Sequence, residues 1–236
     1  MFNNNVHSSL PSLINKTKSV PQAYFKPSDL FQANPPEFDL SEELSGLPFL
    51  NEASALHVIR ARAAANLHHT RAGPALLVIN PQGPLAAYSD KLACHFRGIG
   101  GQEWPPHVYG AAQAAYRALL ASRRDQALVF LGRSGSGKSA SLRHALQFLA
   151  WTAAGGQLTV DRLVAAATIV EAFCTAKSGH TPSATKVTCL YSLDVDQSGQ
   201  VASANVQVSW KQEIILLINK LIFLIFFLGL ENSVVI

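Results

Sequence analysis

The sequence is poor in charged residues and in cysteine, and both shortages narrow the classes of function. Only 14% of its 236 residues are charged, the net charge is +4, and no basic run is interleaved with aromatic residues. Nucleic-acid binding therefore has little support. The three cysteines lack C-x-x-C spacing, which argues against a disulfide framework or a zinc site and favours buried thiols. No secretory signal is predicted at the N-terminus.

The adjacent histidines His68 and His69 are the other candidates for metal ligands. Neighbouring residues on a helix do not share a face, so the pair has the wrong geometry to hold one ion. We predict that both histidines are surface residues.

A glycine-rich loop between an apolar strand and a helix is the most informative feature present. Residues 132–139 read Gly-Arg-Ser-Gly-Ser-Gly-Lys-Ser and fit the phosphate-loop pattern G-x-x-x-x-G-K-[ST]. Residues 126–131 predict a buried strand, and residues 138–153 predict a helix with one apolar face. This order places a nucleotide's phosphates at a helix N-terminus, where free N–H groups and the helix dipole favour negative charge.

Each position of this loop has an expected role. Glycines let consecutive backbone N–H groups turn toward the anion. We expect Lys138 to reach the β- and γ-phosphates and the Ser139 hydroxyl to ligate Mg²⁺. The predicted nucleotide-binding residues of the loop are Gly132, Arg133, Ser134, Gly135, Ser136, Gly137, Lys138 and Ser139.

The rest of the chain predicts alternating helices and strands. Helices are expected over 51–66, 107–122 and 159–173, a strand over 75–79, a loop over 174–187, and a hairpin formed by 189–196 and 201–208. The expected buried residues are Ala55, Leu56, Ile59 and Ala63 on the first helix, and Leu163, Ala166, Ile169, Val170 and Phe173 on the third. Helices and strands around a phosphate loop predict an α/β fold, with a mostly parallel central sheet and flanking helices.

Composition divides the chain into three parts. Residues 1–35 are rich in Asn, Ser, Pro and Lys without periodicity and predict a disordered extension. Residues 36–210 carry the predicted fold, and residues 211–236 form an apolar tail. The stretch 214–230 permits three interpretations: a membrane anchor, a buried core segment, or an aberrant terminus from a misassembled or alternatively processed reading frame. We favour the last, because the stretch is short for a bilayer and a central lysine costs roughly 3 kcal/mol there.

Five ordered blocks resemble the start of a myosin motor head. They are Leu-Asn-Glu-Ala-Ser within 35–62, Asn80-Pro81 followed by Tyr88, Pro-His-Val-Tyr at the start of 106–120, the phosphate loop, and Glu-Ala-Phe at the start of 171–177. Most myosins carry Glu where this loop has Arg133, and the Gly-Ser-Gly spelling is similar to class XVIII myosins. The resemblance implies an incomplete P-loop NTPase core of a motor head.

The resemblance also implies cofactors and further site residues. The cofactors would be ATP or ADP with Mg²⁺, with Asn80, Pro81 and Tyr88 on the adenine side. The myosin switch I pattern Asn-x-Asn-Ser-Ser-Arg falls on residues 181–186. Thr185 would then be a second Mg²⁺ ligand beside Ser139, while Ala184 lacks the hydroxyl that helps to position water. Lys186 replaces an arginine whose planar fork bridges to switch II.

These departures imply a head that binds nucleotide but hydrolyses ATP slowly or not at all, so no catalytic residue is assigned. The implied partners are nucleotide and, through surfaces of a coiled-coil parent motor that this chain lacks, the actin filament. The implied location is cytoplasmic and cytoskeletal, without nucleic acid, and with a membrane contact only through 214–230. Two alternatives stay open: an active ATPase or kinase outside the myosins, with Asp194 as its Mg²⁺-binding carboxylate, and a membrane-anchored nucleotide-binding protein.

Overall fold

The computed structural model describes residues 30–81, 83, 88–98, 104–153, 160–177, 179, 184–209, 221–227 and 233–235. The chain divides into two compact units, Met1–Gln32 and Ala33–Ile236. Every helix and strand named below lies in the second unit.

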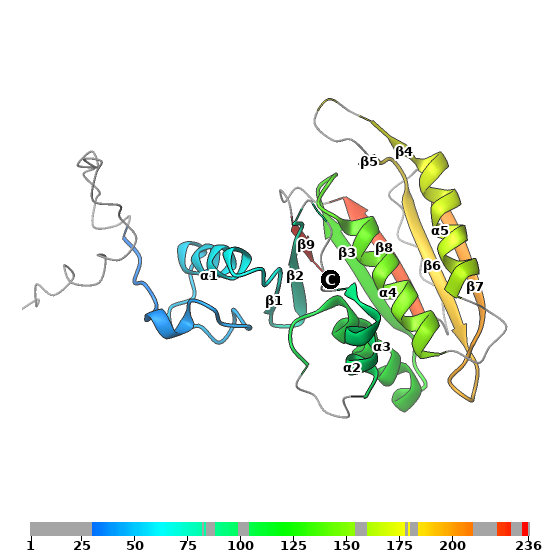
Figure 1. Ribbon diagram of the computed structural model, residues 1–236, viewed down its shortest axis with the longest axis horizontal. Coiled ribbons are helices and arrows are strands. Elements are labelled where there is room, and N and C mark those ends of the chain that lie inside the picture. The colour runs from blue at the N-terminus through cyan, green and yellow to red at the C-terminus, as the bar shows by residue number, and fades with distance from the viewer. Residues whose placement is uncertain are drawn as a thin grey trace, which may run out of the picture. The chain divides into compact units, whose positions relative to one another are not determined.

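A seven-stranded sheet is the centre of this unit (Figure 1). Its strands, in spatial order, are β1 (His69–Ala72), β2 (Ala75–Ile79), β9 (Ser233–Val235), β3 (Gln126–Gly132), β8 (Leu221–Phe227), β6 (Thr188–Val195) and β7 (Val201–Ser209). Two short strands, β4 (Thr175–Ala176) and β5 (Ala184–Thr185), pair antiparallel apart from this sheet. The strands predicted over 75–79 and 126–131 and the predicted hairpin are confirmed.

The prediction of a mostly parallel sheet is wrong for the described strands. Only β3 and β8 pair in parallel, and the other described pairings in the sheet are antiparallel. The reason lies in the short connections, since two residues join β1 to β2 and five join β6 to β7. Such turns can only link antiparallel strands, whereas parallel strands need a long crossover. The phosphate loop is typical of a crossover unit, but it does not determine how the other strands are connected.

The described helices are α1 (Glu52–Ala64), α2 (Asp90–Gly98), α3 (Val108–Ser122), α4 (Lys138–Thr152) and α5 (Val160–Cys174), with a short 3₁₀ helix at Pro36–Phe38. The four predicted helices are confirmed within two residues at each end, and α2 was not predicted. Helix α4 packs on β3 and contacts α3 and α5 (Figure 1). The main core lies between these elements, where Phe130, Leu146, Phe148 and Leu149 are at most 2% exposed.

The predicted apolar face of α1 is only partly correct, since Ala55 and Ile59 are half-buried and pack against a small core of Leu44, Leu47 and Val58. The helix buries Ser54, Val58 and Arg62, while Leu56 is 53% exposed. Arg62 is held by hydrogen bonds to the carbonyl oxygens of Leu40 (2.7 Å) and His69 (2.8 Å). Because those acceptors come from other segments, the pattern of apolar residues within the helix could not reveal this face.

The predicted buried face of α5 is only partly correct. Leu163 is buried as expected, but Ile169 and Phe173 are 60% and 83% exposed. The buried positions after Leu163 are instead Ala167 and Cys174. Val170, which was also predicted, is half-buried and packs against the core.

Two further expectations about burial need correction. Cys174 and Cys189 are buried thiols, but Cys94 is exposed. His69 is 5% exposed and is not a surface residue, because strand β1 directs it into the core. Within the described residues, no cluster of His, Cys, Asp or Glu is arranged to hold a metal ion.

The described part of the apolar tail is strand rather than helix. Strand β8 lies between β3 and β6 and pairs with β3 over seven positions, from Gln126↔Leu221 to Gly132↔Phe227. Residues 214–220 and 228–230 of this apolar stretch lie outside the described residues. None of the described helices has the length and hydropathy to cross a bilayer.

Candidate nucleotide-binding site

The phosphate loop follows β3 directly and leads into α4. Strand β3 ends at Gly132, and α4 begins at Lys138 after the N-cap residue Gly137. Gly135 and Gly137 have φ angles of +80° and +96°, in the region that L-residues with side chains rarely adopt. A Cβ added to Gly137 would also lie 3.4 Å from Cγ of Asn80. These positions therefore favour glycine because of their backbone conformation.

Lys138 lies inside the loop. Its side chain is buried, and its ammonium group donates hydrogen bonds to the carbonyl oxygens of Gly132 (2.7 Å) and Arg133 (2.6 Å). Burial lowers the pKa of Lys138 to about 8. A buried ammonium group is poorly solvated, so a phosphate oxygen beside it would stabilise its charged form.

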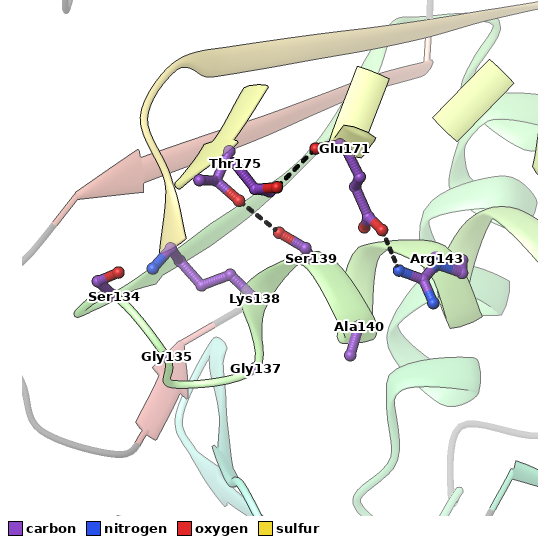
Figure 2. A pocket seen from close by; sticks show the side chains of 10 residues that line it. Ser134, Gly135, Gly137, Lys138, Ser139, Ala140, Arg143, Glu171 and Thr175 are labelled. Atoms are coloured by element: carbon purple, nitrogen blue, oxygen red, sulfur yellow. Dashed lines mark hydrogen bonds and ion pairs between the residues drawn. The ribbon is translucent and has the colours of Figure 1, made fainter. Parts of the chain in front are cut away.

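A cavity of about 200 Å³ lies on one side of the loop, between the start of α4, the end of α5 and β5 (Figure 2). The pairing of β4 with β5 brings Thr185 to its rim. The Oγ atom of Ser139 and the Oγ1 atom of Thr185 are 3.1 Å apart. Two adjacent ligands of an octahedral Mg²⁺ at about 2.1 Å are about 3 Å apart, so this pair fits the ion.

The same cavity holds an ion pair that the sequence did not predict. The Arg143 guanidinium on α4 donates to the Glu171 carboxylate on α5, and both residues line the cavity (Figure 2). Glu171 was known only as part of the block 171–177, and Arg143 had no assigned role. The pair joins the two helices that flank the cavity.

A second cavity, of about 320 Å³, lies against the other side of the loop. Three of its lining residues are the predicted Asn80, Pro81 and Tyr88, and Gly137 and Ala140 line both cavities. The Asn80 side-chain amide donates to the carbonyl oxygen of Gly135 at 2.9 Å, which ties the end of β2 to the loop. The structure thus brings these predicted residues to the loop, and their contacts with a nucleotide stay predictions.

The second cavity also contains His144, which the sequence analysis missed. Ala140, Ser141 and His144 line the cavity from the first turns of α4. Residues three or four positions apart share a helix face, so this spacing from the loop was a usable signal. The His144 ring is stacked on Tyr88, with ring centroids 3.7 Å apart and planes 4° apart.

The segment aligned with switch I is described only from residue 184, since residues 181–183 lie outside the described part. Ala184 is buried and has no hydroxyl. The backbone N–H of Lys186 donates to the Cys174 carbonyl at 2.9 Å, and its side chain is exposed. Of the positions 184–186, only Thr185 therefore directs a polar side chain to Ser139.

Asp194, the alternative Mg²⁺-binding carboxylate, lies at the wrong end of the sheet. Its neighbour Leu193 pairs with Leu221, which in turn pairs with Gln126 at the start of β3. Gly132 is six residues further along β3, about 20 Å away at the rise of a strand. The Asp194 carboxylate accepts a hydrogen bond from Ser203 on β7.

A strand, a glycine loop with its lysine, and a helix beginning at that loop together define a P-loop NTPase fold. The match to the family model "Myosin head (motor domain)" covers residues 41–210. The chain therefore belongs to the myosin head family.

Among curated proteins, the chain is similar to unconventional myosin-XVIIIa of Mus musculus, at 46% identity over 183 residues. It is also similar to unconventional myosin-XVIIIb of Homo sapiens, at 37% identity over 179 residues. These matches cover 76% and 75% of this chain but only 9% and 7% of those proteins. The chain thus spans less than a tenth of the length of either relative and corresponds to an N-terminal part of the motor.

Proposed function

We propose that this chain is the nucleotide-binding N-terminal segment of a class XVIII-type myosin head, which binds ATP or ADP with Mg²⁺ and hydrolyses ATP very slowly or not at all. The observation that carries the proposal is the hydroxyl pair of Ser139 and Thr185, 3.1 Å apart beside the buried Lys138. Lys138 would neutralise the β- and γ-phosphates, and the two hydroxyls would hold the ion.

The expectation of slow hydrolysis rests on residue types around this pair. Phosphoryl transfer needs a positioned water, a held Mg²⁺ and stabilised charge. Ala184 offers no hydroxyl to the water, and Lys186 lacks the planar fork of arginine.

The wider role belongs to the longer protein. Membership of the myosin head family supports an actin-associated, cytoskeletal parent located in the cytoplasm, and the slow turnover would suit a tether better than a force-producing motor. An ATPase or kinase outside the myosins is disfavoured, because Asp194 lies about 20 Å from the loop. The strand structure of β8 gives no support to a membrane anchor.

The test measures the binding of ATP and ADP to the full 236-residue chain, with and without Mg²⁺. The fluorescence of a ribose-labelled ADP reports the binding. Lys138→Ala should weaken binding by about 1.5–3 kcal/mol, since a charge-assisted contact to phosphate is lost. Lys91→Ala, which removes an exposed lysine on α2, is the matched control and should bind normally. Equal affinities for Lys138→Ala and the control would reject the proposed phosphate site.

A further inference from the structure

Four rings from separate segments meet behind the second cavity. His69 comes from β1, Tyr88 precedes α2, His107 precedes α3, and His144 lies on α4. Nε2 of His69 and the Tyr88 hydroxyl are 3.0 Å apart, and the His69 and His107 ring centroids are 4.5 Å apart. The backbone N–H of Tyr109 donates to Nδ1 of His107 at 3.0 Å, which fixes that ring. Tyr88 is therefore anchored from behind by buried partners.

His144 continues this ring cluster to the cavity wall. Its ring is parallel to Tyr88 at stacking distance, and both residues line the cavity. The Gln147 side chain, one turn along α4, hydrogen-bonds to the imidazole. Both rings are thus held in place before any ligand arrives, which reduces the entropy lost on binding.

The second cavity is placed to receive the nucleoside of a bound nucleotide. Gly137 and Ala140 line both cavities, so the two cavities adjoin beside the loop. Phosphates held by Lys138 and Ser139 would leave the base on the side of Tyr88 and His144. Asn80, Ser136, Ser141 and His144 contribute polar side chains to that cavity.

We propose that His144 is a specificity-determining residue that, stacked with Tyr88, selects a purine nucleoside polyphosphate over a pyrimidine one. The proposal rests on the proposed function and deepens it. A purine has two fused rings and overlaps an aromatic wall more fully than a pyrimidine does. Stacking contributes most when the wall is rigid, and here the ring cluster fixes it.

The charge of His144 agrees with this role. Burial lowers the pKa of His144, and the neighbouring Arg143 lowers it further. The imidazole is therefore neutral at pH 7, with one nitrogen that donates and one that accepts.

The experiment compares three ligands on the full chain, each displacing ribose-labelled ADP: ATP, CTP and inorganic tripolyphosphate. Tripolyphosphate reports on the phosphate loop alone, because it has no base. We expect the unmodified chain to bind ATP at least tenfold more tightly than CTP or tripolyphosphate. His144→Ala should weaken ATP binding about tenfold, the loss typical of one base-stacking contact, and leave tripolyphosphate binding unchanged.

Further variants keep the test decisive if alanine destabilises the fold. His144→Gln fills the space without an aromatic ring and should also lose the preference for ATP over CTP. His144→Phe retains an aromatic ring and should keep most of the preference for ATP over CTP. His95→Gln, at an exposed histidine of α2, is the matched control.

The outcomes separate the two proposals. If the chain binds tripolyphosphate and ATP equally, or if His144→Gln keeps the full ATP preference, the role of His144 is rejected and the phosphate site stands. If the chain binds neither ligand, the proposed function and this inference both fail. Loss of the preference for ATP over CTP in His144→Gln, with an unchanged affinity for tripolyphosphate, supports the inference.

Discussion

The two cavities beside the phosphate loop differ in what they offer a nucleotide. The cavity on the His144 side has a fixed ring stack and an asparagine tied to the loop. The cavity on the Thr185 side has two hydroxyls and an Arg–Glu pair, with Ala184 at the neighbouring position. In the proposed function, the His144 side receives the nucleoside and the Thr185 side holds the phosphates and the ion, while Ala184 offers no hydroxyl to the attacking water. We therefore expect that hydrolysis can be lost while nucleotide binding is kept.

The largest expected effect concerns the ring cluster behind the first of these sides. Burial, with smaller contributions from nearby cationic groups, lowers the pKa of His69 from 6.5 to about 3, and burial also lowers that of His144. As the pH falls, the unfolded chain therefore binds protons on its histidines before the folded chain does. The free energy of unfolding is highest above pH 6.5 and falls as the pH decreases toward 3. His69 contributes about 1.4 kcal/mol per pH unit in this window, and His144 adds to the loss in the same direction.

Chemical denaturation at pH 6.5 and pH 5 measures this effect, and we expect His69 alone to account for a loss of about 2 kcal/mol. Carboxylates interfere little there, because their ordinary pKa values lie below 5. His69→Phe should flatten the profile, whereas the exposed control His95→Gln should not. An unchanged slope in His69→Phe would show that His69 is not held neutral by the core.

A second prediction concerns Gly137, which lines both cavities. Gly137→Ala forces a side chain into a φ of +96° beside Asn80, and should destabilise the fold by about 1–2 kcal/mol. It should also weaken tripolyphosphate binding, because the loop must shift. Thermal unfolding and displacement titrations measure the two effects. Gly98→Ala is the control, since a Cβ there meets nothing within 4 Å; equal behaviour of the two variants would contradict the prediction.

A third prediction isolates the Thr185 side. Thr185→Val keeps the shape of the side chain and removes the hydroxyl that faces Ser139. The affinity for ADP measured in Mg²⁺ should fall by about 1 kcal/mol, while the affinity in EDTA should not change. Thr168→Val, at an exposed position of α5, is the control. A loss of equal size in EDTA would mean that Thr185 does not act through the ion.

The smallest effect is expected for the Arg143–Glu171 pair. Its side chains are 37% and 28% exposed, so solvent screens the interaction. A double-mutant cycle with Arg143→Gln and Glu171→Gln should give a coupling energy of about 0.5 kcal/mol. A coupling above about 2 kcal/mol would show that the pair is a main link between α4 and α5.

The sequence predicted the centre of this molecule better than its edges. The strand at 75–79, the loop and helix α4 were found because their signals are local: apolar runs, glycine spacing and a helix start. The antiparallel pairing of most strands was missed, because it depends on the short turns at Gly73 and Gly199 and on where the tail strands β8 and β9 pair. The buried Arg62 and His69 were missed, because their hydrogen-bond partners come from distant segments.

The site was predictable to a similar degree. Of the predicted site residues, the structure gathers loop residues 134–139, Asn80, Tyr88 and Thr185 around the two cavities. Gly132 and Arg133 line neither cavity, and the contacts of all these residues with a nucleotide stay predictions. Arg143 and His144 were not identified, because a helix pattern shows which residues share a face but not what that face meets. The neighbours of that face come from β2 and α5, which lie far away in the sequence.

The separation of binding from turnover is tested most directly by a single-turnover measurement. Excess full-length chain is mixed with radiolabelled ATP and Mg²⁺, and bound nucleotide and released phosphate are followed in the same sample. We expect ATP to be bound and recovered intact, with binding lost in Lys138→Ala. Rapid Mg²⁺-dependent release of phosphate that disappears in Lys138→Ala would contradict the account.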